Sequence, residues 1–266
     1  MPRLAVVGNL SLDRVDGGPP RAGGPPFWAA RALRVLEARA LVAVKCADED
    51  RRVLAPPLVA LGLPVLWLSG SSTAAFSFRY VGDRREMVVD ALGDPWSVED
   101  VRALGDIRWV HVGPLASSDF PAETLAELAR GRRVSFDGHG LARPARTGPL
   151  KLGGAVDPGV LRHVSILKLA EDEAQALLGE ADEPSLRSLD VPEIVVTRGS
   201  RGSLVFADGR LTEISAQPVG KPVDPTGAGD AFATAYLVAR SSGHAPVAAA
   251  RRASALVTGL LAKRLR

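Results

Sequence analysis

A glycine-rich turn runs directly into a predicted helix near the end of the chain, in the sequence DPTGAGDAF over residues 224–232. Glycine lets backbone N–H groups approach a ligand closely, and the first turn of a helix adds unpaired N–H groups and a partial positive charge. Gly227, Ala228 and Gly229 are therefore expected to form an anion hole suited to a phosphoryl group in transfer. Asp230 stands where its carboxylate could take a proton from an attacking hydroxyl, although Asp at this point also serves as an ordinary helix cap.

Three further segments place polar or glycine residues at the end of a predicted strand. They are VVTRGSRG over 195–202, KLAEDE over 168–173 and FDGHG over 136–140. An open α/β sheet binds its ligands beyond the carboxyl ends of its strands, so these segments are expected to face one crevice. The alternatives are a hairpin turn for the first segment and an acidic first helical turn for the second. In the third segment, His139 is interpreted as a loop residue and Asp137 is left open between loop and site.

The elements that must position these residues alternate between buried strands and helices. Two β-rich runs over 73–92 flank Gly82 and Asp83 and predict an exposed antiparallel hairpin. The pattern predicts a single domain over 1–266 with a three-layer α/β/α, doubly wound and mostly parallel sheet. A small β lid is expected from about 72–93, with 13–23 as an optional second part. Strands are predicted over 4–8, 40–46, 64–69, 109–113, 133–137, 165–169 and 193–197, a second hairpin over 203–214, and helices over 27–38, 51–62 (broken by its prolines), 121–131, 171–179, 230–243 and 246–266.

Composition excludes several classes of protein. With 46% hydrophobic residues among 266, the chain can bury a sizeable core, so whole-chain disorder is excluded. A single cysteine, Cys46, excludes a disulfide framework and a multi-cysteine zinc site. The net charge of +3 is too balanced to indicate nucleic acid binding. No apolar run is long enough to cross a membrane and the N-terminus lacks the features of a signal peptide, so a cytoplasmic protein is expected.

The string over 224–232 resembles the C-terminal signature of the PfkB carbohydrate kinases, the ribokinase-like family, written D-T-x-G-A-G-D-x-F. Pro225 stands in the common Thr position. The resemblance implies a ribokinase-like fold, ATP as phosphoryl donor and Mg²⁺. It also implies Asp230 as the catalytic base, with the G-A-G amides as the anion hole.

Two further segments resemble the family's nucleotide and metal motifs. The segment over 195–202 is similar to V-T-x-G-x-x-G, which implies nucleotide binding at Thr197, Gly199 and Gly202. The segment over 168–173 is similar to K-x-N-x-x-E, in which the Lys approaches the nucleotide phosphates and the Glu organises water around Mg²⁺. Lys168 and Glu173 match these two positions. Ala170 replaces the usual Asn and offers no side-chain hydrogen bond, which puts the positioning of metal or phosphate in doubt.

The N-terminal region resembles the family's acceptor motifs. Asp13 ends a G-x-x-x-x-D segment that begins at Gly8, and its carboxylate is implied to bind sugar hydroxyls. Gly23 and Gly24 precede a helix, as in G-G-x-x-x-N-x-A. Trp28 stands at the Asn position, which resembles inositol-type members more than ribokinase itself. Trp28 is expected to cover a ring face of the substrate, with core packing as the alternative.

The predicted function is an ATP-dependent phosphotransferase acting on a hydroxyl of a small sugar or cyclitol, with Asp230 as general base. The expected cofactors are ATP and Mg²⁺, and the resemblance allows a monovalent cation. Neither a nucleic acid nor a membrane partner is expected, and a monomer or a lid-mediated homodimer fits the pattern. A nucleoside kinase of the same fold is one alternative, with Trp28 and Phe76 or Phe78 stacking on a base. A non-catalytic ligand-binding relative is another, to which Ala170 and Trp28 give some support.

Overall fold

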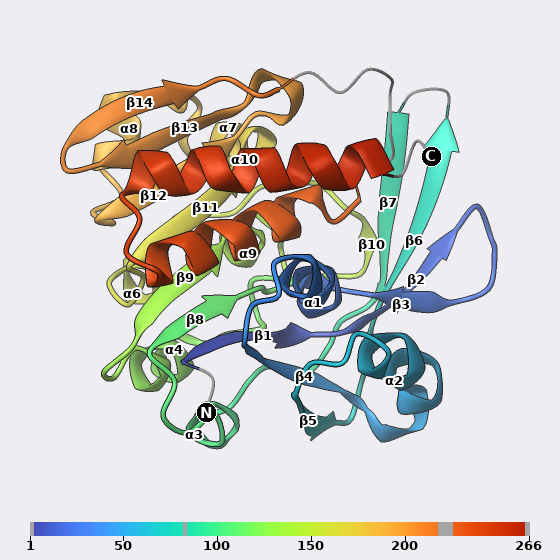
Figure 1. Cartoon of the computed structure of the whole chain (residues 1–266). Helices are drawn as coiled ribbons and strands as arrows, with labels where there is room; N and C mark the ends of the chain where they lie inside the picture. The colour runs from blue at the N-terminus through green and yellow to red at the C-terminus, as the bar shows by residue number, and fades with distance from the viewer. Residues whose placement is uncertain (1–2, 82–83, 218–225, 264–266) are drawn as a thin grey trace.

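The computed structural model describes residues 3–81, 84–217 and 226–263, and its centre is a large, mostly parallel sheet (Figure 1). Strands from β12 to β5 pair in parallel, and β13 and β14 add an antiparallel hairpin at one edge. The interior strands are short apolar runs buried on both faces, as parallel strands require, whereas the edge strand β5 is only partly buried. In spatial order the strands are β14 (Arg210–Ile214), β13 (Ser203–Ala207), β12 (Glu193–Thr197), β11 (Ile166–Ala170), β9 (Arg133–Asp137), β8 (Trp109–Val112), β1 (Leu4–Asn9), β4 (Leu41–Ala47) and β5 (Val65–Gly70).

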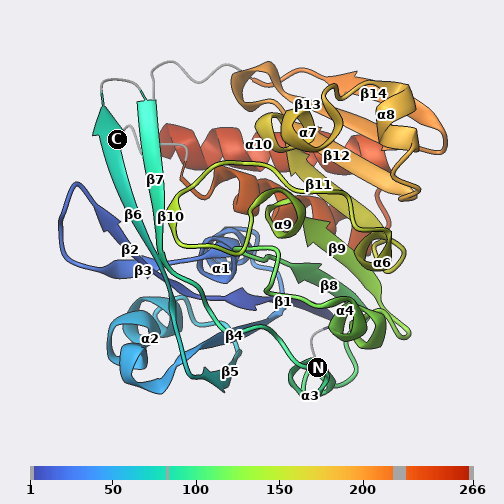
Figure 2. The same cartoon turned by 180° about the vertical axis from the view of Figure 1, so that it is seen from behind.

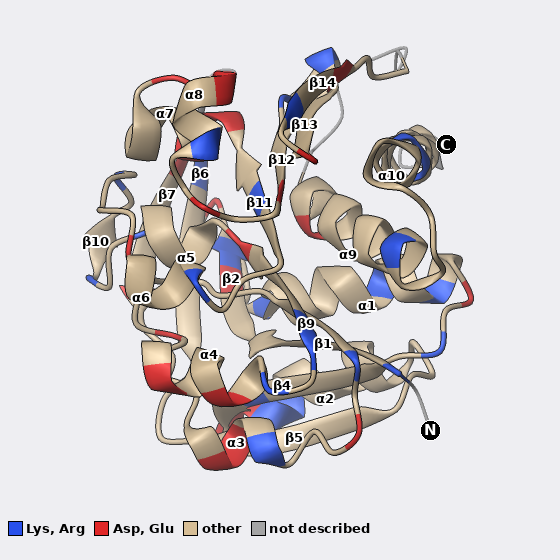
Figure 3. Ribbon diagram, turned by 90° about the vertical axis from the view of Figure 1, so that its left-hand side faces the viewer, with Lys and Arg blue, Asp and Glu red and all other residues tan. Residues whose placement is uncertain are grey.

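Two layers of helices cover the two faces of this sheet, each with its own hydrophobic cluster. Figure 3 shows the sheet between them, and most charged residues lie toward the outside. The three-layer α/β/α architecture predicted from the alternating pattern is therefore confirmed. The helices in front in Figure 1 are α1 (Pro25–Val35), α9 (Ala228–Ser241) and α10 (Pro246–Lys263). Those on the opposite face, seen in Figure 2, are α3 (Val98–Arg102), α4 (Ala122–Leu128), α6 (Pro158–Leu161), α7 (Glu171–Leu178) and α8 (Glu183–Arg187).

One helix departs from the expectation that prolines would break it. Helix α2 (Arg51–Val59) runs through Pro56 and Pro57, and its buried Leu54 and Leu58 pack into the same cluster as α1. The N–H of Ala60 still donates to the carbonyl of Pro56. Each proline removes one hydrogen bond to the preceding turn, yet the chain keeps its helical course to Val59 while Leu54 and Leu58 are buried against the core.

A second sheet of five strands stands beside the large one as the lid. The antiparallel pairing of β6 with β7 confirms the hairpin expected over 73–92, although Gly82 and Asp83 lie outside the described residues. The segment 13–23 contributes as well, because β2 pairs in parallel with β6 and in antiparallel with β3. This lid sheet is larger than the single hairpin expected at minimum. Its strands in order are β10 (Gly148–Pro149), β7 (Arg84–Ala91), β6 (Ala74–Val81), β2 (Ser11–Val15) and β3 (Arg21–Gly23).

Within the described ranges, no helix is both long enough and apolar enough to cross a membrane.

Candidate active site

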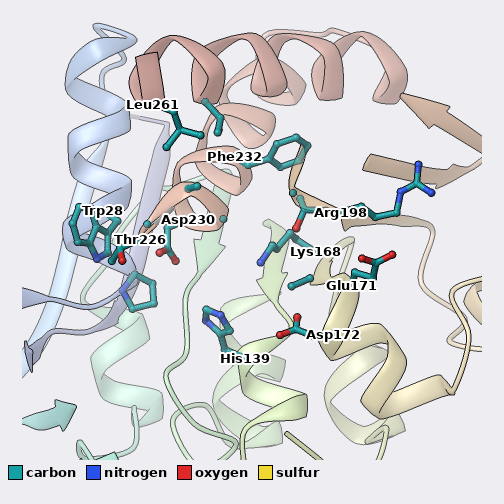
Figure 4. A pocket seen from close by; sticks show the side chains of 18 of the residues that line it. Trp28, His139, Lys168, Glu171, Asp172, Arg198, Thr226, Asp230, Phe232 and Leu261 are labelled. Atoms are coloured by element: carbon teal, nitrogen blue, oxygen red, sulfur yellow. The ribbon is translucent and has the colours of Figure 1, made fainter. Parts of the chain in front are cut away.

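A cavity of about 1090 Å³ lies between the carboxyl ends of the large sheet, the lid and α10 (Figure 4). Most of the predicted site residues meet there, although they come from opposite ends of the chain. Gly23 and Glu173 do not line the cavity but contact residues that do. The predicted residues on its wall are Asp13, Gly24, Trp28, Lys168, Thr197, Gly199, Gly202, Gly227, Ala228, Gly229 and Asp230.

The predicted anion hole is the first turn of α9. Gly227 is the N-cap residue and has a left-handed backbone with φ of 76°, which a residue with a side chain adopts only with strain. A Cβ atom at Gly227 would also lie 2.4 Å from the indole of Trp28. The N–H groups of Ala228, Gly229 and Asp230 open this helix, so no carbonyl four residues earlier within the helix accepts from them. The turn therefore presents donors to the cavity at a place where only glycine fits.

Asp230 follows directly and is almost wholly buried, with 8% of its surface exposed. Its Oδ1 has no hydrogen-bond partner within the described part of the chain. Burial is the main cause that raises the pKa of Asp230 to about 7; the nearby carboxylate of Asp137 adds to this, while Lys168 and Arg143 oppose it. A carboxylate with a pKa near the operating pH is suited to general-base work.

Helix α9 is anchored to the sheet at its far end by a buried network. Tyr236 donates its hydroxyl hydrogen to Glu193 at the start of β12, and Arg240 donates to both carboxylate oxygens of Glu193 at 2.9 Å. Because this network fixes the position of α9 along the sheet, the first turn and Asp230 are held at the cavity.

Lys168 lies beside the first turn of α9 and is buried in the middle of β11. Its Nζ is 3.3 Å from Oδ2 of Asp137, which ends the neighbouring strand β9. A Cβ atom at Gly229 would lie 3.2 Å from the same Nζ, so the ammonium group sits against the first turn of α9. Burial lowers the pKa of Lys168, but the carboxylates of Asp137, Glu173 and Asp230 outweigh it and the net pKa is raised. Lys168 is therefore a permanent positive charge beside the hole.

His139 and Glu173 extend this charged cluster. Instead of a loop, as expected, His139 begins the short helix α5 (His139–Ala142) and lines the cavity. Its Nε2 is 3.2 Å from Oε1 of Glu173, and its Nδ1 is 3.5 Å from Oδ1 of Asp137. Burial and the charge of Arg143 hold the pKa of His139 well below its usual value, so the ring is neutral at pH 7. Figure 4 shows Asp230, Lys168 and His139 directed toward a common space.

Glu173 also has a structural task. The N–H of Ala170 donates to Oε2 of Glu173 at 2.7 Å, which closes the first turn of α7 from the third position of the helix. Ala170 is the N-cap residue and has no side-chain acceptor of its own. Burial raises the pKa of Glu173, with the charge of Lys168 opposing it.

The residues of the predicted acceptor motifs pack around the paired glycines. Asp13 is buried on β2, and Oγ of Ser11 donates to its Oδ1 at 2.7 Å. A Cβ atom at Gly23 would lie 2.1 Å from Oδ2 of Asp13, so strand β3 can approach this carboxylate only at a glycine. Gly24 has φ of 93°, and a Cβ atom there would lie 2.6 Å from the carbonyl oxygen of Asn9. These contacts explain why two consecutive glycines precede α1.

Trp28 lines the cavity from α1 while packing on Gly227. The guanidinium carbon of Arg31 lies 5.0 Å from its ring centre, and Phe27 meets it edge-on at 5.4 Å. The indole of Trp28 therefore lies between α1 and the first turn of α9. Its predicted contact with a substrate ring stays a prediction.

The lid supplies an apolar wall opposite these polar groups. Phe76 and Phe78 on β6 and Met87 on β7 line the cavity, together with Leu115 after β8. The alternation along β6 points to Phe76 and Phe78, but nothing local in the sequence predicts the contribution of Leu115. Arg143, which follows α5 and also lines the cavity, was missed for the same reason.

The donor end lies at the carboxyl edge of β12. Oγ1 of Thr197 donates to the carbonyl of Leu169 at 3.3 Å. Gly202 has φ of 96°, and a Cβ there would lie 1.9 Å from the carbonyl oxygen of Ile214, so this glycine is required by the hairpin itself. The lining from this turn, from the segment after β14 and from α9 and α10 is mixed. Apolar Ala216, Phe232, Val257 and Leu261 alternate with polar residues, namely Arg198, Ser200, Gln217, Ser254 and Thr258.

Comparison with known proteins agrees with this geometry. The chain is 31% identical to a fructokinase of Salmonella thompson over 159 residues, which are 56% of this chain and 71% of the relative. It is 38% identical to a cytidine kinase of Thermococcus kodakarensis over 147 residues, which are 52% of this chain and about half (49%) of that relative.

A solved structure resembles nearly the whole chain. It is described as a pyrophosphate-dependent kinase in the ribokinase family complexed with a pyrophosphate analog and myo-inositol. The two superpose with a TM-score of 0.84 at 25% identity, covering 97% of this chain and 94% of that one. Residues 89–258 match the family described as pfkB family carbohydrate kinase. The chain is therefore a member of the pfkB family, a ribokinase-like kinase and phosphotransferase.

Proposed function

We propose that this kinase transfers the γ-phosphoryl group of ATP to a hydroxyl of a small sugar or cyclitol, with Asp230 as the general base. The observation that supports this most is the buried carboxylate of Asp230, which has one oxygen without a hydrogen bond in the described region and adjoins the first turn of α9. A carboxylate placed beside a set of backbone donors combines the two groups that phosphoryl transfer needs.

The roles of the other residues follow from their places in the cavity. Asp13 holds hydroxyls of the acceptor, and its orientation is fixed by Ser11. Asp230 takes the proton of the attacking hydroxyl as the oxygen bonds to phosphorus. The N–H groups of residues 227–229 and the ammonium group of Lys168 stabilise the charge on the transferring group. Thr197, Gly199 and Gly202 border the donor.

A divalent cation fits the charged cluster beside the anion hole. Asp137 and Glu173 offer buried carboxylate oxygens, the ligand type that Mg²⁺ prefers, and Oδ2 of Asp137 faces only the ammonium group of Lys168, at 3.3 Å, among the described residues. When bound, Mg²⁺ would neutralise charge on the donor phosphates. Glu173 would hold such an ion directly or through water, and Lys168 adds its own positive charge from the other side.

The donor end favours a nucleotide. Ala216, Val257 and Leu261 form an apolar surface that a flat base could cover, and a phosphate-only donor has no use for it. The solved relative that is described as pyrophosphate-dependent makes inorganic pyrophosphate the donor to test beside ATP.

The acceptor end supports a second candidate, a nucleoside. Phe76, Phe78, Met87 and Leu115 present more apolar surface than the face of a polyol ring would cover. In that case Asp13 would hold the ribose diol and the base would lie against the lid. The match to a cytidine kinase agrees with this candidate, and the resemblance to a myo-inositol complex agrees with the first.

A substrate screen tests the proposal. The purified chain is incubated with Mg²⁺ and either ATP or pyrophosphate against inositols, hexoses, pentoses and nucleosides, and phosphorylated products are identified by mass spectrometry. We expect ATP-dependent phosphorylation of a cyclitol or sugar that disappears in Asp230→Asn. Phosphorylation of nucleosides alone would select the second candidate, and pyrophosphate as the better donor would overturn the choice of ATP. No product with any pair would support a non-catalytic protein.

A further inference from the structure

Three metal-binding side chains converge at the edge of the cavity: Asp137, His139 and Glu173. One potential ligand atom from each lies within 4.8 Å of the others. They come from the end of β9, the start of α5 and the first turn of α7, so folding alone brings them together. Ligand atoms about 2.1 Å from one ion and roughly at right angles lie about 3 Å apart. The 3.2 Å between Nε2 of His139 and Oε1 of Glu173 agrees with that spacing.

The cluster is held in place by its backbone. The N–H of Gly138 donates to the carbonyl of Lys168 at 2.7 Å, which ties the turn before α5 to strand β11. A Cβ atom at Gly138 would lie 2.9 Å from Oε2 of Glu173, so the turn approaches this carboxylate as closely as a glycine allows. The site therefore exists before any ligand binds, which lowers the entropy that binding must offset.

The carboxylate of Asp137 is the most deeply buried group of the cluster. It has no exposed surface; its Oδ1 accepts the N–H of His139, and its Oδ2 lies 3.3 Å from the ammonium group of Lys168. Lys168 compensates the charge of Asp137 from 3.3 Å, and Glu173 and Asp230 place two further carboxyl groups near the same ammonium group.

We propose that Asp137, His139 and Glu173 form a cation site with one nitrogen and two oxygen ligands, which selects Mn²⁺ over Mg²⁺. Mn²⁺ shares the preference of Mg²⁺ for carboxylate oxygens, but it stands at the start of the first-row series whose affinity for mixed nitrogen and oxygen sites rises, whereas Mg²⁺ demands near-ideal octahedral geometry and keeps its waters. One ring nitrogen of His139 faces Glu173 and the other faces Asp137.

The role of this ion in phosphoryl transfer rests on the proposed function, but its binding does not. The experiment therefore omits donor and acceptor. Full-length protein stripped with a chelator is titrated with Mn²⁺, and free Mn²⁺ is followed by electron paramagnetic resonance, with and without competing Mg²⁺. Pulsed measurements on the bound ion then report whether a ¹⁴N nucleus of an imidazole couples to it.

We expect ¹⁴N coupling in the wild type and its loss in His139→Asn, which keeps a polar side chain but offers oxygen in place of the ring nitrogen. The affinity for Mn²⁺ should fall at least about 10-fold in this variant, and the affinity for Mg²⁺ should fall much less. The ratio of the two affinities should therefore become smaller. His163→Asn, in a histidine outside the cluster, is the matched control and should behave as the wild type.

Wild-type protein whose bound Mn²⁺ shows no ¹⁴N coupling would overturn the proposal, even if the variant failed to fold. Coupling that persists in a folded His139→Asn, shown by an unchanged circular dichroism spectrum, would overturn it as well. Absence of kinase activity in a protein that shows the coupling would contradict the proposed function and leave the cation site standing.

Discussion

Replacing Asp230 by Asn should make the protein more stable at alkaline pH while abolishing transfer. The reason is the burial of this carboxyl group, whose pKa is about 7 in the folded protein against 3.8 without its surroundings. Ionised Asp230 is therefore unfavourable in the fold, and the free energy of unfolding includes that penalty whenever the pH is high enough to remove the proton. Asparagine has nearly the same shape and carries no charge at any pH.

The sign follows from proton binding. Between pH 3.8 and about 7 the unfolded chain has lost this proton and the folded protein has kept it. The contribution of Asp230 to stability is thus fully present below pH 3.8, declines as the pH rises and is lost above about 7. The gap between the two pKa values corresponds to about 4 kcal/mol at high pH, of which about 3 kcal/mol develops between pH 5 and pH 9.

Thermal unfolding of wild type and Asp230→Asn at pH 5 and pH 9 measures this difference. For a chain of this length about 3 kcal/mol corresponds to about 6 °C, so the Tm of the variant relative to wild type should rise by that amount between the two pH values. Asp106→Asn, at an exposed aspartate, is the control and should show no such pH dependence. A variant whose relative Tm stays constant, or falls at pH 9, would refute the assignment of a buried, charge-penalised carboxyl. In the same variant kcat should fall roughly 10²–10⁴-fold.

Other perturbations test neighbouring parts of the site. In the wild type, kcat/KM should rise with pH and level off above about 7, as Asp230 loses its proton; a profile flat from pH 5 to 9 would contradict its role as base. Gly23→Ala would push a Cβ atom into the carboxylate of Asp13, so we expect a higher KM for the acceptor and a loss of about 1–3 kcal/mol in chemical denaturation. Trp28→Asn should weaken acceptor binding by about 1–2 kcal/mol in calorimetry if the indole covers a ring, whereas an unchanged affinity with a lower Tm would identify a purely packing role. Glu173→Gln keeps an acceptor for the helix cap but removes a charge, so it should raise the metal concentration needed for half-maximal activity and leave the Tm near that of wild type.

The sequence predicted the fold and the glycine-rich start of α9 because both are encoded locally. Strands buried on both faces appear as short apolar runs, and their alternation with helices leaves few arrangements of the sheet. Gly227 has a left-handed backbone, and helix α9 begins at the next residue. Both features belong to a few neighbouring positions of the sequence. A pattern of this kind can be recognised without knowing what lies across the cavity.

Part of the glycine pattern was ambiguous for the same local reason. Gly202 fits the nucleotide motif, yet the hairpin requires it because the carbonyl of Ile214 lies where a side chain would be. Gly23 fits the acceptor motif, yet its necessity comes from the carboxylate of Asp13, ten positions earlier. Sequence marks such positions but does not say which neighbour demands the glycine.

Tertiary structure alone decided which side chains form the charged cluster of Asp137, His139, Lys168 and Glu173. It also decided which apolar side chains line the cavity from the lid. Asp137 and Lys168 become neighbours through the parallel register of β9 and β11, and Glu173 reaches His139 only because α7 starts beside that turn. The lid sheet likewise joins β2 to β6, although more than fifty residues separate them. The sequence by itself determined the strands, helices and anion-hole turn, since backbone propensity and burial pattern act over a few residues. Which side chains share the cavity depended on contacts between distant segments, whose energies no local pattern contains.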